Sequence, residues 1–415
     1  MIRLRVPRLR RRAGADEAER LHARAQELRA DGLSGDALGV ALSCLALVDD
    51  GPGFVRASIL ATVGRLHADL ADPAQAQQSY NEALAALTGT SSDGDGGRLR
   101  ARILGGQAHC MRLQGRYPEA EAAFRDARAV AETALGADDP ELAVLLNGQA
   151  VVYKYTGRFD EAEMLYRQAL AICERALGPE HLDCAGIHHN LGGLGHARGR
   201  FVDAEAPARR AVEIREAALG ADHPAVAADR AALAAILDTL GRREEARDLL
   251  QESLAVFERV YGPDHYEVAV TLHNLATVEQ RNGDTRLAED LYRRALAIKE
   301  RALGPDHPEL VTTLNNLATV LRRDARYDEA AELYRRCLSV LAATVPPDHP
   351  AVETCRSNYA LLLRQSGRSD DTAGIDGPVR SGGSGALGGG VGGVPTGGSG
   401  ARPSPGASSQ PMFDA

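Results

Sequence analysis

Residues 304–344 read GPDHPELVTTLNNLATVLRRDARYDEAAELYRRCLSVLAAT, and this stretch decides the fold. Asp306 suits a helix N-cap, Pro308 suits the first turn, and Glu309 lies three residues after the cap, as in a capping box. Four leucines then recur at spacings that place them on one helical face: Leu310, Leu314, Leu317 and Leu321. The first half of the stretch is therefore predicted to be an amphipathic helix.

A second amphipathic helix is predicted after Ala325. Its inward-facing residues would be Ala330, Leu333, Tyr334, Cys337, Leu338 and Leu341. One helix pair of this size cannot bury both of its apolar faces by itself. Stacking such pairs side by side buries them, which predicts a solenoid of antiparallel helix pairs.

The same pattern recurs every 42 residues. One series marks the ends of the second helices: Gly136, Gly178, Gly220, Gly262, Gly304 and Pro346. Another marks the turn inside each pair: Gly115, Gly157, Gly199, Gly241, Gly283, Ala325 and Gly367. A third is an alanine of the second helix: Ala120, Ala162, Ala204, Ala246, Ala288 and Ala330. Three series on one period indicate an internal repeat.

The repeat predicts where each element begins. Helix pairs are expected to start near residues 16, 54, 98, 138, 180, 222, 264 and 306, and a single last helix is expected over 348–366. The first two pairs, within 16–87, are degenerate. The segment TGTSSDGDGG at 88–97 is expected to form a loop that interrupts the array.

The two ends of the chain differ from the repeats. Residues 1–15 are predicted to be a basic disordered arm, since the first twelve residues hold six arginines and no acid. The Gly/Ser/Pro-rich residues 367–415 are predicted to be a disordered tail, because they bury too little apolar area to offset the entropy of ordering. The net charge of −9 argues against general nucleic-acid binding, and no apolar run is long enough to span a membrane.

The repeat resembles the tetratricopeptide repeat. In the unit at 138 the matching residues are Leu146, Gln149, Ala150, Tyr153, Gly157, Phe159, Ala162, Tyr166 and Ala169. The 42-residue length, with LGPDH at 303–307 and TLNNLA at 313–318, is similar to the kinesin-light-chain type. The resemblance covers 98–366 strongly and 16–87 weakly, and it implies an all-α, right-handed superhelical solenoid. Residues 1–50 lack the sustained heptads of a kinesin light chain, so a motor partner is not supported.

The resemblance also implies that the first helix of each pair lines a concave groove. The residues it places there and that we expect to bind a partner are Asn190, His273, Asn274, Gln280, Arg281, Asn315, Asn316, Arg322, Arg323, Asn358 and Arg364. Asparagine can donate to and accept from a peptide backbone, and arginine offers a fork of donors to carboxylates. We therefore expect the segment from about 264 to 366 to hold an extended acidic peptide or a free C-terminus. The alternative is that these asparagines bridge adjacent helices and the arginines pair with local acids.

Other candidate chemistry is sparse. The cysteines at 44, 110, 173, 184, 337 and 355 form no CxxC, which indicates reduced thiols and a cytoplasmic protein. Histidines recur at 181, 223, 265, 307 and 349, where they suit helix capping better than a metal array. A weak candidate for zinc is the cluster of Cys173, His181, Cys184 and His188; otherwise no metal is expected.

These observations favour a protein–protein interaction scaffold or adaptor. No cofactor is expected, because the chain has no phosphate loop or nucleophile motif, and repeats over 16–366 leave no stretch for a catalytic domain. The alternatives are a peptide-responsive regulatory sensor and an accessory subunit of an enzyme encoded elsewhere. The residues do not identify the partner or the oligomeric state.

Overall fold

The chain is described from a computed structural model that covers residues 8–30, 32–48, 53–89 and 93–368. These residues form seventeen helices and no strand. Helices α1 to α9 are Arg8–Ala30, Ser34–Leu45, Phe54–Asp69, Pro73–Ala86, Gly94–Leu113, Tyr117–Leu135, Pro140–Tyr155, Phe159–Leu177 and Leu182–Ala197. Helices α10 to α17 are Phe201–Leu219, Pro224–Thr239, Arg243–Tyr261, Tyr266–Asn282, Thr285–Leu303, Leu310–Arg323, Tyr327–Thr344 and Pro350–Gln365.

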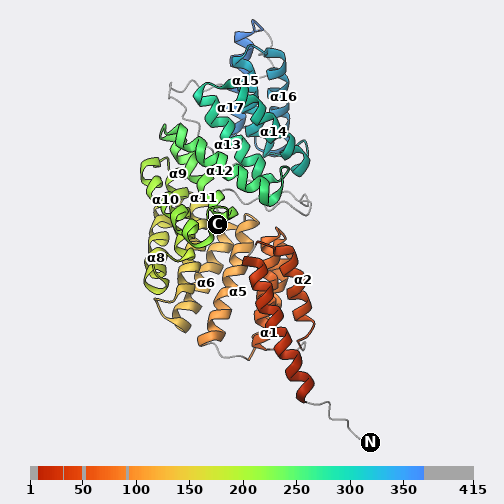
Figure 1. The fold of residues 1–415 in the computed structure, drawn as a ribbon, viewed down its shortest axis with the longest axis vertical. Helices are drawn as coiled ribbons and strands as arrows, with labels where there is room; N and C mark the ends of the chain where they lie inside the picture. Colours follow the sequence, from red (N-terminus) through yellow and green to blue (C-terminus); the bar gives the residue numbers. More distant parts are fainter. Residues whose placement is uncertain (1–7, 31, 49–52, 90–92, 369–415) are drawn as a thin grey trace, which may run out of the picture. The chain divides into compact units, whose positions relative to one another are not determined.

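The helices form eight pairs and a last single helix, as the repeat predicts. Within a pair the two helices pack along each other, as α1 with α2 and α5 with α6 (Figure 1). Contacts divide the chain into two units, with the boundary inside α9 between Leu194 and Gly195. None of the described helices is both long and apolar enough to cross a bilayer.

Two boundaries differ from expectation. Helix α1 begins at Arg8, inside the segment assigned to the basic arm. Helix α5 begins at Gly94, so the end of the expected loop at 88–97 belongs to a helix. Residues 1–7 and 369–415, which contain the start of the arm and nearly all of the expected tail, lie outside the described residues.

A histidine recurs before the first helix in each of five successive repeats, and its ring accepts a hydrogen bond from a backbone N–H group. In His223, His265 and His349 the ring Nδ1 accepts a hydrogen bond from the backbone N–H two residues later, at 3.1 to 3.2 Å. His307 does the same at 3.3 Å from the Glu309 backbone nitrogen, and α15 begins only at Leu310. The prediction that Asp306 is the cap is therefore wrong, because the histidine satisfies the exposed N–H group instead.

The core is built from small side chains and a few fully buried tyrosines. The largest fully buried side chains are Tyr166, Tyr292 and Tyr334, which occupy one position of the repeat on α8, α14 and α16. Alanines of the same second helices, such as Ala162 and Ala288, are completely buried. Helices that meet through alanine approach closely, and each tyrosine fills the remaining space between repeats.

A glycine of α5 packs directly against a tyrosine of α4 in the first unit. A Cβ added at Gly106 of α5 would lie 2.3 Å from Cζ of Tyr80 on α4, a side chain that is itself buried. Such a distance is far inside van der Waals contact, so either the ring or the helix must move. Gly106 thus marks a position where α4 and α5 fit only without a side chain.

Replacing Gly106 with alanine is expected to lower the free energy of unfolding by about 1–3 kcal/mol, because the new methyl group overpacks the Tyr80 ring. Urea unfolding followed by circular dichroism measures the change. The matched control is Gly39→Ala in α2, where an added Cβ meets nothing within 4 Å. The control should be neutral or stabilising by up to about 1 kcal/mol, as helix propensity alone predicts. An equal effect of both substitutions would contradict the packing argument.

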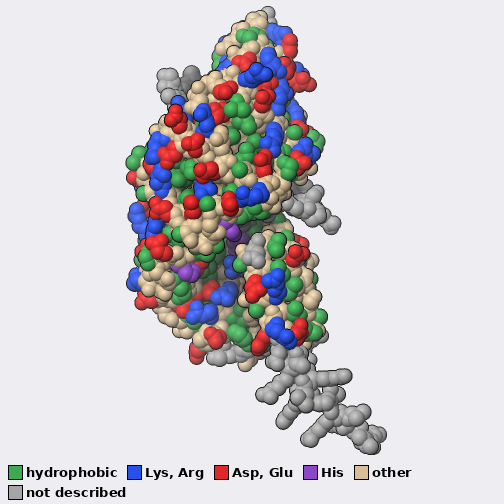
Figure 2. Space-filling model, viewed as in Figure 1, with side chains coloured by type: hydrophobic (Ala, Val, Ile, Leu, Met, Phe, Trp, Pro, Cys, Tyr) green, Lys and Arg blue, Asp and Glu red, His purple; other side chains and the backbone are tan. Residues whose placement is uncertain are grey.

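The second helices of successive repeats are linked at their surface by arginine–glutamate ion pairs. Within the second unit, Arg294 of α14 reaches Glu258 of α12, and Arg336 of α16 reaches Glu300 of α14, each at 2.5 Å. These side chains are about one-third to two-fifths exposed. On the face shown in Figure 2, basic and acidic side chains are accordingly intermingled over these helices.

Candidate functional site

The first helices of the second unit lie on its inner side. The backbones of α11 and α13, of α13 and α15, and of α15 and α17 approach each other directly. Among the described residues, the backbones of successive second helices do not approach in this way. Where second helices are linked, the long side chains of arginine and glutamate span the gap between them. Because the first helices are spaced more closely than the second helices, the face formed by α11, α13, α15 and α17 is the concave one.

Amide side chains bridge neighbouring first helices on this face. Nδ2 of Asn358 on α17 donates to Oδ1 of Asn315 on α15 at 3.0 Å. In the first unit, Nδ2 of Asn190 donates in the same way to Oδ1 of Asn147 at 2.9 Å. Each bridge uses one donor and one acceptor, whereas an amide side chain offers two N–H groups and two lone pairs. The bridge therefore fixes the orientation of the Asn315 and Asn358 amides without exhausting their hydrogen bonds.

A buried polar cluster underlies the face between α13 and α15. Nδ1 of His273 lies 3.1 Å from Oγ1 of Thr313, and Nζ of Lys299 on α14 donates to the same oxygen at 3.4 Å. Burial, reinforced by the positive charge of Lys299, lowers the pKa of His273 to about 3. His273 is only 8 % exposed, so it is a neutral packing residue and not part of an open binding surface. Asn190 is likewise fully buried.

Tyr292 holds two of the predicted groove residues, Gln280 and Asn316, in place. The Tyr292 hydroxyl donates to Oε1 of Gln280 at 3.1 Å and shares a hydrogen bond with Oγ1 of Thr277. It also forms a hydrogen bond with Asn316. Burial raises the pKa of Tyr292 to about 12, so the hydroxyl keeps its proton at neutral pH. Gln280 and Asn316 are thereby tied to the core, while Asn274 is half-buried on the same face of α13.

The four predicted arginines fall into two classes. Arg281 forms an ion pair with Asp238 of α11, and Arg322 donates to Oε1 of Gln365 at 2.7 Å. Arg323 and Arg364 are exposed, and within the described part of the chain neither side chain has a hydrogen-bond or ion-pair partner. Two fixed arginines and two available ones thus line α13, α15 and α17.

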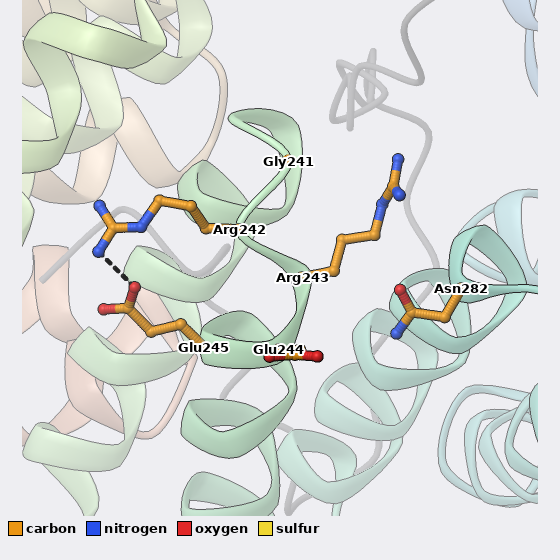
Figure 3. A pocket seen from close by; sticks show the side chains of 6 residues that line it. All are labelled: Gly241, Arg242, Arg243, Glu244, Glu245 and Asn282. Atoms are coloured by element: carbon orange, nitrogen blue, oxygen red, sulfur yellow. Dashed lines mark ion pairs between the residues drawn. The ribbon is translucent and has the colours of Figure 1, made fainter.

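A shallow polar pocket of about 450 Å³ opens where the turn between α11 and α12 faces the end of α13. Its lining is Gly241, Arg242, Arg243, Glu244, Glu245 and Asn282 (Figure 3). The side chain of Arg242 is paired with Glu245 (Figure 3). Nε of Arg243 lies 4.0 Å from Oδ1 of Asp238. This pocket continues the polar lining past the Arg281–Asp238 pair.

Asp238 is the residue whose role the sequence analysis missed. Asp238 was not among the residues expected to line the groove, yet it forms an ion pair with Arg281 of the next repeat. Burial raises the pKa of this carboxyl, against the opposing effect of Arg281 and Arg243. The sequence did contain a signal: partners on adjacent first helices lie 43 residues apart, as in the Asn147–Asn190 and Asn315–Asn358 bridges.

The weak zinc candidate is not assembled. Sγ of Cys184 lies 2.9 Å from Sγ of Cys173, but His181 caps α9 by accepting from the Asp183 backbone nitrogen at 3.2 Å. The described residues contain no group of three or more His, Cys, Asp or Glu side chains placed to hold a metal ion. Burial raises the pKa of both thiols, which keeps Cys173 and Cys184 protonated.

The profile of the family described as "Tetratricopeptide repeat" matches five overlapping segments, at residues 99–175, 144–217, 183–259, 233–301 and 267–343. Together these segments span 99–343, which is more than half of the 415 residues. A search of curated proteins finds no match.

Three solved structures are similar to the chain. BtubC (BKLC) from P. vanneervenii is 26% identical, with a TM-score of 0.47, over 55% of this chain and 91% of that one. A variant of a putative kinesin light chain from Podosopora anserina is 25% identical, with a TM-score of 0.44, over 49% and 95% of the two chains. The apo form of RapI is 14% identical, with a TM-score of 0.60, over 88% and 96%, and this likeness shows the fold alone.

Proposed function

The chain belongs to the tetratricopeptide repeat family, and from this premise we propose that the concave face of α13, α15 and α17 binds an extended acidic segment of a partner protein. Proteins of this family are protein–protein interaction scaffolds, typically without enzymatic activity. The observation that carries the proposal is the pair of exposed arginines, Arg323 and Arg364, which have no acidic partner among the described residues.

The asparagines support an extended conformation of the bound segment. Asn315 and Asn358 are oriented by their own bridge, so their remaining N–H and C=O groups are held in place before a ligand arrives. A peptide backbone offers the complementary donors and acceptors at every residue, whatever its side chains. Preorganised amides reduce the entropy lost on binding. In this proposal the asparagines hold the backbone, and Arg323 and Arg364 select acidic side chains.

Charge explains why the C-terminal part of the face is the better site. In α13, Arg281 is already neutralised by Asp238, so it offers little attraction to a carboxylate. In α15 and α17, Arg322 is bound to the neutral side chain of Gln365 and keeps its full charge. Arg322, Arg323 and Arg364 therefore form a local positive surface on a protein with a net charge of −9.

Replacing Arg323 and Arg364 together with alanine is expected to weaken the binding of a fluorescein-labelled hexaglutamate peptide by at least about tenfold, because each charge-assisted contact contributes about 1.5–3 kcal/mol. Fluorescence anisotropy at low salt measures the change. The matched control is Arg335→Ala on α16, another exposed arginine, which lies on a second helix. Equal losses in both variants would contradict binding at this face.

A second variant tests the amides. Asn315→Ala combined with Arg323→Ala is expected to abolish capture of the native partner from a cell extract while shifting the melting temperature little. Unchanged capture, or a loss of the folded state, would overturn the assignment of these residues. Scattering measurements with and without the hexaglutamate peptide address the sensor alternative, since a fixed adaptor keeps its dimensions on binding.

A further inference from the structure

Two thiols meet where one repeat of the first unit joins the next. Cys173 lies in the last two turns of α8, and Cys184 lies in the first turn of α9. Their sulfur atoms are 2.9 Å apart, and both thiols are free and fully buried. A disulfide bond is about 2.05 Å long, so the two sulfur atoms need to approach by only about 1 Å for this bond to form.

The thiol pair lies next to the short connection between α8 and α9. Sγ of Cys184 lies 3.4 Å from the carbonyl oxygen of Gly178, in the middle of this connection. Residues 174–183 around it are all exposed, except for the half-buried Gly178. Exposed segments of this kind open locally while the rest of the structure stays folded. Such an opening would admit a small solute to both sulfur atoms.

Helix α9 has a low intrinsic tendency to be helical. Four of its sixteen residues are glycines: Gly186, Gly192, Gly193 and Gly195. Glycine loses more conformational entropy than any other residue when it is ordered in a helix. The folded state of α9 therefore depends on its attachment to neighbouring helices. A covalent link from its first turn to α8 would restrict its opening.

The two thiols differ in how readily they ionise. Burial raises the pKa of both, and the charges of Glu174 and Asp183 act in the same direction, so neither is a thiolate while the connection is closed. Contacts with Cys173 and with the backbone of His181 partly offset this effect at Cys184, whereas contact with Cys184 raises the pKa of Cys173 further. Cys184 also lies at the N-terminal end of a helix, where a negative charge is favoured. On opening, Cys184 is therefore the thiol that ionises first.

We propose that Cys173 and Cys184 form a reversible disulfide when the protein meets a hydroperoxide, and that this bond fastens α9 to α8. The Cys184 thiolate attacks one peroxide oxygen, the O–O bond breaks, and a sulfenic acid forms while the other oxygen leaves as an alcohol or as water. The sulfur of Cys173 then attacks the sulfenic sulfur, the S–S bond forms, and water leaves with the thiol proton. The two electrons that the sulfur atoms lose reduce the peroxide. This modification does not depend on binding at the face of α13, α15 and α17.

The test exposes the reduced full chain to hydrogen peroxide, blocks the remaining thiols with N-ethylmaleimide and digests the chain with trypsin. Mass spectrometry is expected to find the peptides 168–175 and 176–198 joined, and to find them separate after dithiothreitol. The matched control is Cys110 of α5, a buried thiol with no cysteine partner among the described residues, which should stay reduced. Met164, which is 60% exposed on α8, shows by its oxidation that peroxide has acted on the protein.

Hydrogen exchange measures the effect of the bond on α9. Backbone amides of residues 182–190 are expected to exchange at least about tenfold more slowly in the oxidised chain than in the reduced chain. Two variants assign the roles of the thiols. In Cys173→Ala the sulfenic acid of Cys184 persists and is trapped by dimedone, whereas Cys184→Ala should leave Cys173 unlabelled.

The outcomes decide each part of the proposal. Oxidised Met164 with both thiols intact would overturn it, and so would oxidation of Cys110 at the same rate, because the thiols would then react only through general unfolding. A disulfide that leaves exchange in α9 unchanged would overturn the fastening of this helix. Dimedone labelling of Cys173 and not of Cys184 would overturn the order of attack. The first two measurements use the unsubstituted chain, so poor folding of a variant does not affect them.

Discussion

Replacing Asp229 with asparagine is expected to lower the free energy of unfolding by about 3–5 kcal/mol. Asp229 on α11 is fully buried, and its Oδ1 lies 2.5 Å from a terminal nitrogen of Arg215 on α10, which is only 11% exposed. Asparagine keeps the shape of the side chain but removes the charge. Arg215 would then remain buried without a counter-ion at the junction between two repeats, and such a charge is much costlier than the loss of the pair itself.

An exposed pair of the same chemistry provides the control. Arg259 lies 3.0 Å from Asp222, and these side chains are 54% and 82% exposed. Asp222→Asn is expected to change the free energy of unfolding by no more than about 0.5 kcal/mol. Guanidinium unfolding of both variants, with comparison of their m-values, measures the difference. A loss below about 1 kcal/mol for Asp229→Asn would mean that water reaches Arg215 at this junction.

Replacing Lys299 with methionine is expected to stabilise the protein at pH 7 by roughly 3 kcal/mol. Lys299 takes the place of Arg215 two repeats further along the chain, but Thr313 stands where Asp229 would be. The amine therefore has a hydroxyl contact at 3.4 Å and no ion pair with a described carboxylate. Burial lowers its pKa from 10.5 to about 8, a shift equivalent to roughly 3 kcal/mol, and methionine removes this penalty.

The pH dependence gives this prediction a sign. The folded-state pKa of Lys299 lies below that of the unfolded chain, so between about pH 8 and 10.5 the unfolded state binds more protons. The contribution of Lys299 to stability therefore rises with pH through this window. Thermal melts of wild type and Lys299→Met across pH 7–10.5 should show a difference that is largest at pH 7 and shrinks toward pH 10.5. A constant difference would mean that folding does not lower the pKa of this amine, so that Lys299 stays solvated in the folded protein.

The helix pairs could be predicted from the sequence because the repeat encodes them several times over. The glycines of the turns and second-helix ends, together with the buried alanines of the second helices, specify one local structure in repeat after repeat. The error at Asp306 arose because two adjacent residues both suit a cap. Whether Asp306 or His307 reaches the N–H group depends on where the helix starts, and composition does not fix that to one residue.

The binding face was harder to predict because it depends on which charges remain after pairing. The repeat places Arg281 and Arg323 at equivalent positions. Only Arg281 has an acidic residue, Asp238, at the facing position of the preceding first helix. His273 was expected at the surface, but Thr313 and Lys299 hold its ring in the core. Each of these outcomes depends on pairs of residues in different repeats, which a single repeat does not reveal.

The two sides of the second unit are held together by different kinds of bond. The inner helices are joined by the neutral amide bridge Asn315–Asn358 and by the largely buried Arg281–Asp238 pair, while more exposed ionic contacts such as Arg336–Glu300 join the outer ones. Dissolved salt weakens the exposed ionic contacts and leaves the amide bridges nearly unchanged. Raising the ionic strength is therefore expected to loosen the outer helices before the inner ones. The curvature of the unit would then change before the unit unfolds.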